Sequence, residues 1–369
     1  MPDKAEKKVS WLELFFDLVF VTAVSYTTHL FISIEHYHML MHLGEYLLMV
    51  FPMFWVWCGQ TMFINRFGEH VNRQELFMIP QMFLFILMTA SLDFDFNHTF
   101  YSFLAGYVGL RAIIVIEYFY VGRKLTQKPS ALILSRLFIV GVAVPLCSLF
   151  LEGNARYVVL YCGIAADIIL PLFFHRRLLQ TPVNLPHLSE RFGLFVLITF
   201  GESLVSVTNI LVNNTLNGRT LAFALLSFLL ICVMWYSYYY AYEKIINRHK
   251  TTNGQMLLYG HFFIFISVMI LAGTIEMIQE NHLERMLLAL FLYGSIAVFY
   301  SAKSIVFTYY RKHDKWYYKK ETLVMLLAMS AFFLINCLWP MSFAVNLGIL
   351  LATCGLEALV QRRKLELIS

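Results

Sequence analysis

The sequence predicts an all-α protein, a polytopic integral membrane bundle of about twelve transmembrane helices with little chain outside the bilayer. Composition provides the first observation. Hydrophobic residues make up 59% of the 369 residues and charged residues only 14%, whereas roughly a quarter of the residues in soluble domains are charged. A soluble protein this apolar could not cover its surface with polar side chains. A helix surrounded by lipid tails, in contrast, exposes Leu and Phe at little cost.

Apolar runs provide the second observation. They recur along the chain, and each is near the ~20 residues that cross ~30 Å of hydrocarbon. We expect spans at residues 11–33, 42–63, 75–92, 98–121, 132–150, 156–174, 190–212, 219–242, 255–277, 285–309, 322–339 and 342–360. Only a very short turn at residues 339–342 separates the last two spans. Residues 322–360 could therefore hold one span and a re-entrant segment instead.

The placement of basic residues is the third observation. With about twelve spans, nearly all Lys and Arg residues fall in the two termini and in the loops on the same side. Only Arg156, Arg219 and Arg285 fall in loops on the opposite side. Basic loops remain in the cytoplasm when a membrane protein inserts. We therefore expect both termini in the cytoplasm.

A loop with two prolines divides this single membrane domain into two predicted halves, residues 1–178 and 179–369. Each half opens with a helix that carries an acid, Asp17 in the first and Glu202 in the second. Each continues with an aromatic helix that ends in Asn-Arg, at residues 65–66 and 247–248. A half with an even number of spans returns to its own side, so both halves would face the same way. We expect a parallel pseudo-repeat about an axis along the membrane normal.

Charged side chains inside the spans are the first candidates for a functional site, because charges are costly in lipid. At about 1.5 Å per residue, Glu202, Asp167 and Arg111 lie near the middle of the bilayer. Asp17 lies nearer the cytoplasmic end of its span, and Lys303 is close enough to that end to extend its ammonium group to the interface. We expect all five to face a common polar interior, with Arg111 paired to Glu202 or Asp167. The alternative is a charge cluster that only fixes helix packing.

Glu13 and Asp17 are four residues apart and share one face of the first span. The two carboxylates would repel each other unless a cation, a proton or a basic side chain lies between them. Glu13 also falls in the first helical turn, where the helix dipole stabilises a carboxylate that has no functional role.

No motif indicates a cofactor, and the cofactor stays unassigned. The six cysteines form no CxxC pair, and no nucleotide-binding or metallohydrolase motif occurs in a suitable context. His36, His38 and His42 fall just outside the first span, where an exposed histidine needs no ligand, so we expect no metal site. The expected partners are the lipid bilayer and a small ion, small polar solute or lipid, and not nucleic acid.

Two motifs are specific enough to indicate a family. Residues 11–21 read WLELFFDLVFV, and residues 187–195 read HLSERFGLF with GES following at 201–203. They resemble the opening and second signatures of the bacterial low-temperature-requirement A (LtrA) family. Residues 55–67 are similar to its aromatic second helix, whereas Trp235-Tyr236 stands where a Trp-Trp pair is usual. The resemblance implies a bacterial cytoplasmic-membrane protein linked by name to growth in the cold. Its motif residues here are Glu13, Asp17, His187, Glu190, Arg191 and Glu202.

These observations lead to three hypotheses for function. The first is a transporter or channel-like protein of unassigned substrate, whose intramembrane charges line a polar path between the two halves. In it, Glu202 is the central proton or cation site and Arg111 its counter-charge. The second is a membrane-embedded enzyme, or a lipid- or cofactor-binding protein, with a cytoplasmic-side site formed by Glu13, Asp17, His187, Glu190 and Arg191. The third is an accessory structural subunit. The near-absence of loops disfavours an enzyme.

Overall fold

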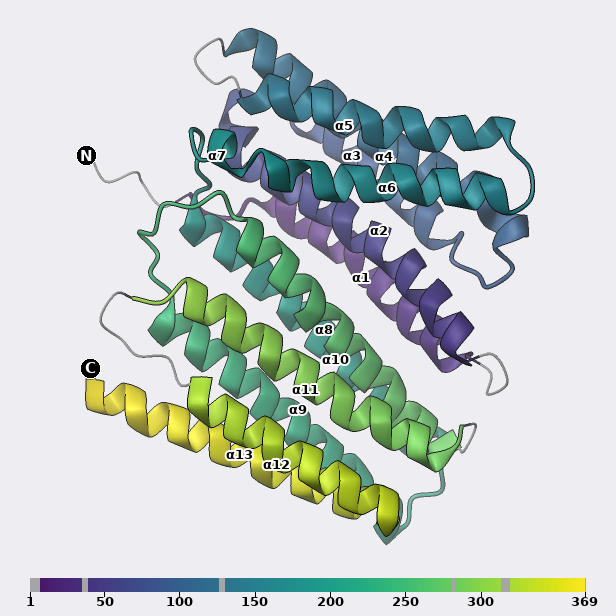
Figure 1. The fold of residues 1–369 in the computed structure, drawn as a ribbon, viewed down its shortest axis with the longest axis vertical. Coiled ribbons are helices and arrows are strands. Elements are labelled where there is room, and N and C mark those ends of the chain that lie inside the picture. The colour runs from purple at the N-terminus through teal and green to yellow at the C-terminus, as the bar shows by residue number, and fades with distance from the viewer. Residues whose placement is uncertain (1–6, 35–38, 126–129, 281–282, 313–318, 369) are drawn as a thin grey trace. The chain divides into compact units, whose positions relative to one another are not determined.

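The computed structural model describes residues 7–34, 39–125, 130–280, 283–312 and 319–368. Every regular element in these ranges is helical (Figure 1), apart from an isolated β-bridge between Ile246 and Arg311. The α-helices are α1 (Trp11–Ile32), α2 (Met39–Phe67), α3 (Glu75–Thr89), α4 (Phe96–Lys124), α5 (Ser130–Cys147), α6 (Asn154–Phe173), α7 (His175–Leu178), α8 (Leu185–Asn213), α9 (Gly218–Ile245), α10 (Gln255–Glu280), α11 (Arg285–Tyr309), α12 (Lys319–Leu338) and α13 (Phe343–Ile368). The all-α prediction is confirmed.

Eleven helices among the described residues are long and apolar enough to cross a membrane. Each corresponds to one predicted span. The predicted span at 75–92 corresponds to α3, which has only 15 residues and rises about 22 Å at 1.5 Å per residue. Over residues 322–360 the structure has two separate long helices, α12 and α13, and not one span with a re-entrant segment.

Exposed apolar stripes mark the helix faces that suit contact with lipid. On α3, Leu76, Ile79, Phe83 and Ile86 follow each other at three- and four-residue spacing, and all four are exposed. This spacing places them on one face of the helix, and soluble monomers rarely expose apolar patches of this kind. Although α3 is short, it therefore presents the same kind of surface as the longer spans.

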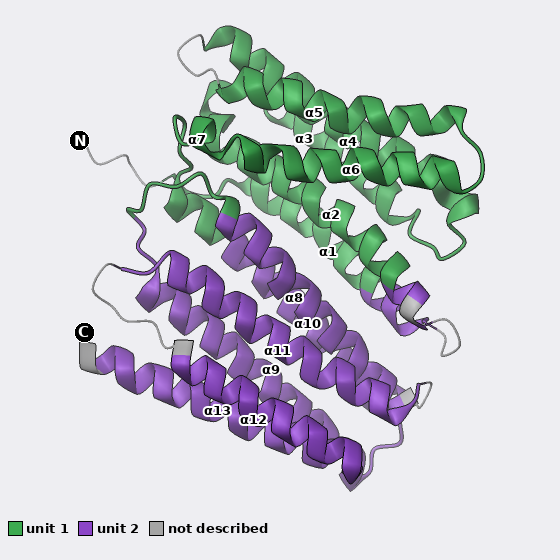
Figure 2. Cartoon of the chain, viewed as in Figure 1, with its two compact units in different colours: residues 1–27, 44–191, 249–255 green, residues 28–43, 192–248, 256–369 purple. Residues whose placement is uncertain are grey.

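By compactness the chain divides into two units (Figure 2). Unit 1 contains residues 1–27, 44–191 and 249–255, and unit 2 contains residues 28–43, 192–248 and 256–369. In unit 1, α3 packs on α4, α4 on α5, and α5 on α6; in unit 2, α9 packs on α13, and α12 packs on α11 and α13. The first turns of α1 and α8 belong to unit 1. The predicted division at residue 178 rests on repeated sequence rather than on compactness, and it stays a prediction.

Helix α2 forms the core of unit 1, since 78% of its most apolar stretch is buried. Trp55 and Trp57 are two residues apart, so their side chains leave the helix in nearly opposite directions. Gln60 contacts Glu117 of α4, and Asn65 contacts Asn184 just before α8. Because α2 is enclosed, it supplies polar side chains to several surrounding helices of unit 1 at once.

Candidate functional site

Helix α1 begins with a capping box. The backbone N–H of Ser10 donates to Glu13 Oε2 over 2.9 Å, and the backbone N–H of Glu13 donates to Ser10 Oγ over 3.3 Å. Both bonds satisfy N–H groups that the start of a helix leaves without partners. The side chain of Glu13 is thereby fixed at the beginning of α1.

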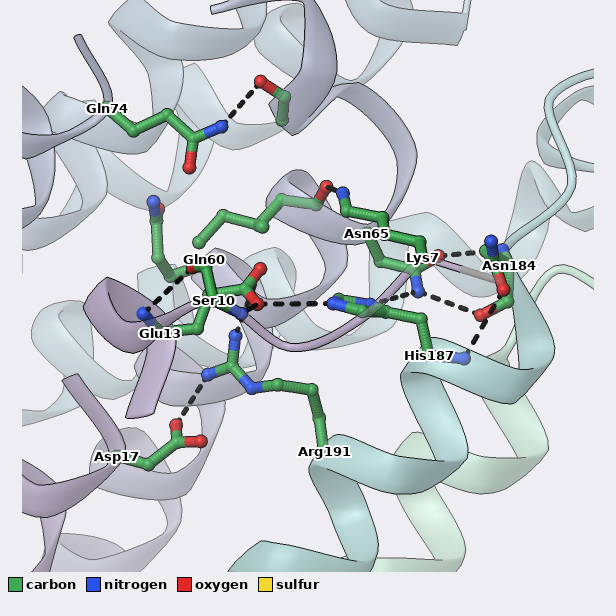
Figure 3. A network of polar contacts seen from close by, with 12 residues as sticks. Lys7, Ser10, Glu13, Asp17, Gln60, Asn65, Gln74, Asn184, His187 and Arg191 are labelled. Atoms are coloured by element: carbon green, nitrogen blue, oxygen red, sulfur yellow. Dashed lines mark hydrogen bonds and ion pairs between the residues drawn. The ribbon is translucent and has the colours of Figure 1, made fainter. Parts of the chain in front are cut away.

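Helix α8 begins at a turn held by Asn65 of α2 (Figure 3). Asn65 Nδ2 donates to the carbonyl oxygen of Asn184, and Asn65 Oδ1 accepts from the backbone N–H of Asn184, both over 2.9 Å. Asn184 Oδ1 accepts from the backbone N–H of His187 over 3.3 Å, as a helix N-cap does. Pro186 follows in the first turn, where a missing N–H is tolerated. These bonds determine the place of His187.

Asn65 also sets the tautomer of His187. Two backbone groups orient the Asn65 amide, so its remaining N–H faces His187 Nδ1 over 3.0 Å. Nδ1 must then accept, and the imidazole carries its proton on Nε2. Nε2 donates to Glu13 Oε2 over 3.2 Å. In this arrangement His187 is a neutral bridge between α2 and α1.

One turn further along α8, the guanidinium of Arg191 meets both carboxylates of α1. Arg191 Nη2 lies 2.5 Å from Asp17 Oδ1, and Arg191 Nη1 lies 3.7 Å from Glu13 Oε1. Trp57 Nε1 of α2 donates to the same Asp17 oxygen over 2.8 Å. All of these side chains are buried. We name Glu13, Asp17, His187 and Arg191 the α1–α8 cluster.

The pairing within the α1–α8 cluster fixes the relative direction of the first turns of α1 and α8. Glu13 meets His187, and four residues later on each helix Asp17 meets Arg191. The two helices therefore run the same way at this point. Parallel neighbours that cross a bilayer start on the same side, so an even number of crossings separates their starts. The sequence predicts six spans between the two starts, with α3 among them, and six is an even number.

The α1–α8 cluster has hydrogen-bonding capacity that the described residues leave unused. Asp17 Oδ2 can accept and Arg191 Nε and Nη1 can donate, yet these buried atoms have no hydrogen-bond partner in the described part of the chain. The carboxylates of Glu13 and Asp17 also share the guanidinium of Arg191. Lys7 brings a further positive charge near Glu13, and burial lowers the pKa of Lys7 while that carboxylate acts to raise it. Such a cluster can take up a proton, a cation or a small polar solute.

A second buried ion pair joins α4 and α6 in unit 1. Arg111 Nη2 donates to Asp167 Oδ1 over 2.7 Å, and neither side chain is exposed. Asp167 Oδ2 accepts from Trp55 Nε1 over 2.8 Å and from Tyr107 Oη over 3.2 Å. Of the two partners predicted for Arg111, the structure shows Asp167. The carboxylate accepts three hydrogen bonds and joins α2, α4 and α6.

Unit 2 contains its own buried ion pair. Lys303 Nζ of α11 lies 3.0 Å from Glu357 Oε1 of α13, and Lys303 also donates to Ser237 Oγ of α9. Ser237 Oγ donates to Glu357 Oε2 over 2.9 Å. Lys303 is close enough to reach the membrane interface but does not extend there, because its side chain is fully buried. Glu357 compensates the ammonium charge inside the unit.

The two remaining predicted acids lie in different surroundings. Glu202 is buried in the part of α8 that belongs to unit 2, as an acid in the middle of a span should be. Glu190 is exposed. Within unit 1, Asp17 and Asp167 each bind a base of their own. Asp17, Asp167 and Lys303 therefore belong to three separate ion pairs in the described structure.

Sequence reasoning overlooked three buried acids in the spans: Glu117, Glu276 and Glu357. Glu276 accepts from Asn209 Nδ2, which lies 3.2 Å from each of its oxygens. The signal that identified Asp167, an acid inside an apolar run, could have found all three. They lie nearer to span ends than Glu202 does, where a carboxylate is more easily assumed to reach the interface.

The described residues contain no group of three or more His, Cys, Asp or Glu side chains that could hold a metal ion. His36 and His38, weighed as ligands from the sequence, lie outside the described residues. All six cysteines are free thiols.

Comparison with known proteins gives one family and one curated relative. A family model described as "Bacterial low temperature requirement A protein (LtrA)" matches residues 8–359, nearly the whole chain. An uncharacterized protein of Rhizobium meliloti (strain 1021) is 26% identical over 273 residues, which cover 69% of this chain and 66% of that protein. The chain thus spans about two thirds of the length of this relative. No solved structure matches this chain.

Proposed function

The chain belongs to the bacterial low temperature requirement A family, and from this premise we propose that it is a multi-pass transporter or channel-like protein for a small ion or small polar solute. The observation that carries the proposal is the α1–α8 cluster, which is buried and incompletely hydrogen-bonded. Charges inside spans are costly enough to mark ion or substrate pathways by default. Asp17 and Arg191 would contact the transported species.

His187 supports a coupling role for protons. A second proton on Nδ1 would remove the bond from Asn65 and strengthen the attraction to Glu13. Because Asn65 also holds Asn184 at the start of α8, protonation of His187 would loosen that turn. The geometry therefore supports a link between proton binding and movement of the first turn of α8.

The other charged residues inside the spans have different roles in this proposal. Glu202 stays the candidate for a central proton or cation site, because its burial suits that role. Asp167 accepts three hydrogen bonds, and Lys303 is bound on two sides. The bonds to Asp167 and to Lys303 favour a structural role for the two pairs, although Arg111 Nε and Nη1 have no hydrogen-bond partner in the described part of the chain.

A flux measurement tests the proposal. Purified protein in liposomes should carry a proton, Na⁺ or K⁺ current under an imposed gradient, and His187→Gln should lower it roughly tenfold or more. Glutamine keeps a donor for Glu13 but cannot take up the second proton. Glu366→Gln is the control, because that acid belongs to an exposed ion pair with Arg362. Ion transport is excluded if none of the three gradients drives current above protein-free liposomes, and the role of His187 is wrong if His187→Gln conducts like wild type.

A lipid-headgroup site is the second candidate, because the α1–α8 cluster contains four of the five residues predicted for it. Burial disfavours it, since a headgroup could reach Asp17 and Arg191 only if α1 and α8 separated. Thermal stabilisation by one headgroup class, without any ion flux, would favour this function over transport.

We also propose that both termini are cytoplasmic and that the membrane is the bacterial cytoplasmic membrane, as the basic loops indicate. Reporter fusions after Gly68 and Thr181 should then read cytoplasmic, and fusions after Asn97 and Asn154 should read external. The fusions at Gly68 and Asn97 flank α3, so they test whether this short helix crosses. If those two fusions report the same compartment, α3 does not cross and the parity argument fails.

A further inference from the structure

Glu117 of α4 lies in a polar group that the proposed function does not use. Gln60 Nε2 of α2 donates to Glu117 Oε1 over 3.2 Å, and Gln81 Nε2 of α3 donates to Glu117 Oε2 over 3.1 Å. Gln81 Nε2 also donates to Gln60 Oε1 over 3.1 Å. Glu117 is 1% exposed and both glutamines are fully buried. We name these three residues the Glu117 site.

No basic side chain in the described part of unit 1 forms an ion pair with Glu117. Besides Glu117, the charged side chains on α4 and on the helices in contact with it are Arg111, Arg123 and Lys124 on α4, Glu45 and Arg66 on α2, Glu75 on α3 and Arg136 on α5. The other titratable groups there are His98, Tyr101, Tyr107, Tyr118 and Tyr120 on α4, His42, Tyr46 and Cys58 on α2, and Cys147 on α5. Arg123 and Lys124 are exposed. Arg111 is bound to Asp167, and Arg66 donates to the carbonyl oxygen of Asn253 over 2.7 Å. Each arginine is six residues, or about 9 Å along its helix, from the Glu117 site. Glu75 and Arg136 are exposed.

An ionised Glu117 would therefore be a buried charge with only amide N–H groups to stabilise it. Desolvation of such a charge outweighs the gain from two neutral donors, so the group takes up a proton instead. The second observation is Gln81 Oε1, a buried acceptor with no hydrogen-bond partner among the described residues. The two ends of a glutamine amide are interchangeable in space. Turning the Gln81 amide over would place Oε1 beside the acid as an acceptor for its proton.

We propose that Glu117, Gln60 and Gln81 form an intramembrane proton-binding site, occupied by a proton at neutral pH. Binding the proton replaces the two hydrogen bonds that Gln81 Nε2 donates, to Gln60 and to Glu117, with one from the acid to Gln81. The exchange also removes a buried negative charge, which is the larger effect. The Glu117 site does not depend on ion transport through the α1–α8 cluster.

Infrared spectroscopy tests the proposal on the full chain in lipid, with 13C-labelled glutamate carboxyl groups. The wild-type spectrum at neutral pH minus that of Glu117→Gln should contain a protonated carboxyl C=O band, which converts to carboxylate bands as pH rises. Glu75→Gln is the matched control on an exposed acid, and its difference spectrum should contain carboxylate bands only. Gln81→Leu should move the acid band to higher frequency, because the acid loses its acceptor.

Two results would overturn the proposal. Carboxylate bands in the Glu117→Gln difference at neutral pH would show that Glu117 is ionised. A band that responds to Na⁺ concentration instead of pH would show a cation site. Glutamine has the shape of the protonated acid, so Glu117→Gln should fold. If it does not fold, the proposal is tested by Gln81→Leu alone, through the frequency of the protonated carboxyl band. The spectrum reports the proton whether or not the protein moves an ion.

Discussion

Arg191→Met should lower the free energy of unfolding by about 3–5 kcal/mol, the range for breaking a buried ion pair by removing one partner. Methionine roughly fills the space of the arginine stem, so packing is largely retained. The loss arises because the carboxylates of Glu13 and Asp17 would stay buried without the guanidinium between them. Unfolding in mixed detergent micelles with increasing SDS measures the change.

A second substitution separates the lost charge from other effects of Arg191→Met. Adding Asp17→Asn removes one of the two uncompensated carboxylates, so the double variant should recover part of the lost stability. The control is Arg362→Met, which breaks an ion pair whose side chains are both more than half exposed. Exposed pairs at this spacing contribute only about 0.3–0.5 kcal/mol. If Arg191→Met and Arg362→Met unfold at the same SDS fraction, the α1–α8 cluster is not a buried charge network.

Gly141→Ala should strongly disrupt the packing of unit 1. A Cβ atom on Gly141 of α5 would lie 2.5 Å from Asp167 Oδ1 and 2.7 Å from Asp167 Cβ. Asp167 cannot turn aside, because Arg111, Trp55 and Tyr107 hold its carboxylate. Overpacking costs about 1–3 kcal/mol, and displacing the ion pair adds to that. We expect a net loss of about 2 kcal/mol or more after the helix-propensity gain of alanine, ~1 kcal/mol.

Gly44→Ala is the matched control for Gly141→Ala. A Cβ atom on Gly44 of α2 meets nothing within 4 Å, so alanine should be neutral or stabilise by about 0.5–1 kcal/mol. The same SDS-unfolding measurement compares the two variants. Equal stability of Gly141→Ala and Gly44→Ala would mean that α5 and α6 do not approach each other as closely as described.

The sequence by itself determined the helical membrane class and the place of nearly every span. Lipid acts on the average apolarity of each run of ~20 residues, and that average can be read without knowing any partner helix. The same local logic singled out Asp17, Asp167 and Arg111, because a charge inside an apolar run is costly wherever its neighbours are. It placed Glu13 in the first turn of α1 as well, where the helix dipole stabilises a carboxylate.

Only the tertiary structure decided which charges pair. Asp17 and Arg191 are separated by 174 residues along the chain, and sequence gives no distance between such positions. Arg111 meets Asp167 because Gly59 and Gly141 leave room for the guanidinium and the carboxylate. Lys303 stays buried because Glu357 of α13 lies 3.0 Å from its ammonium group in unit 2. Pairing depends on distances of a few ångströms between side chains on different helices, because the attraction between two charges falls with their separation and rises as water is excluded.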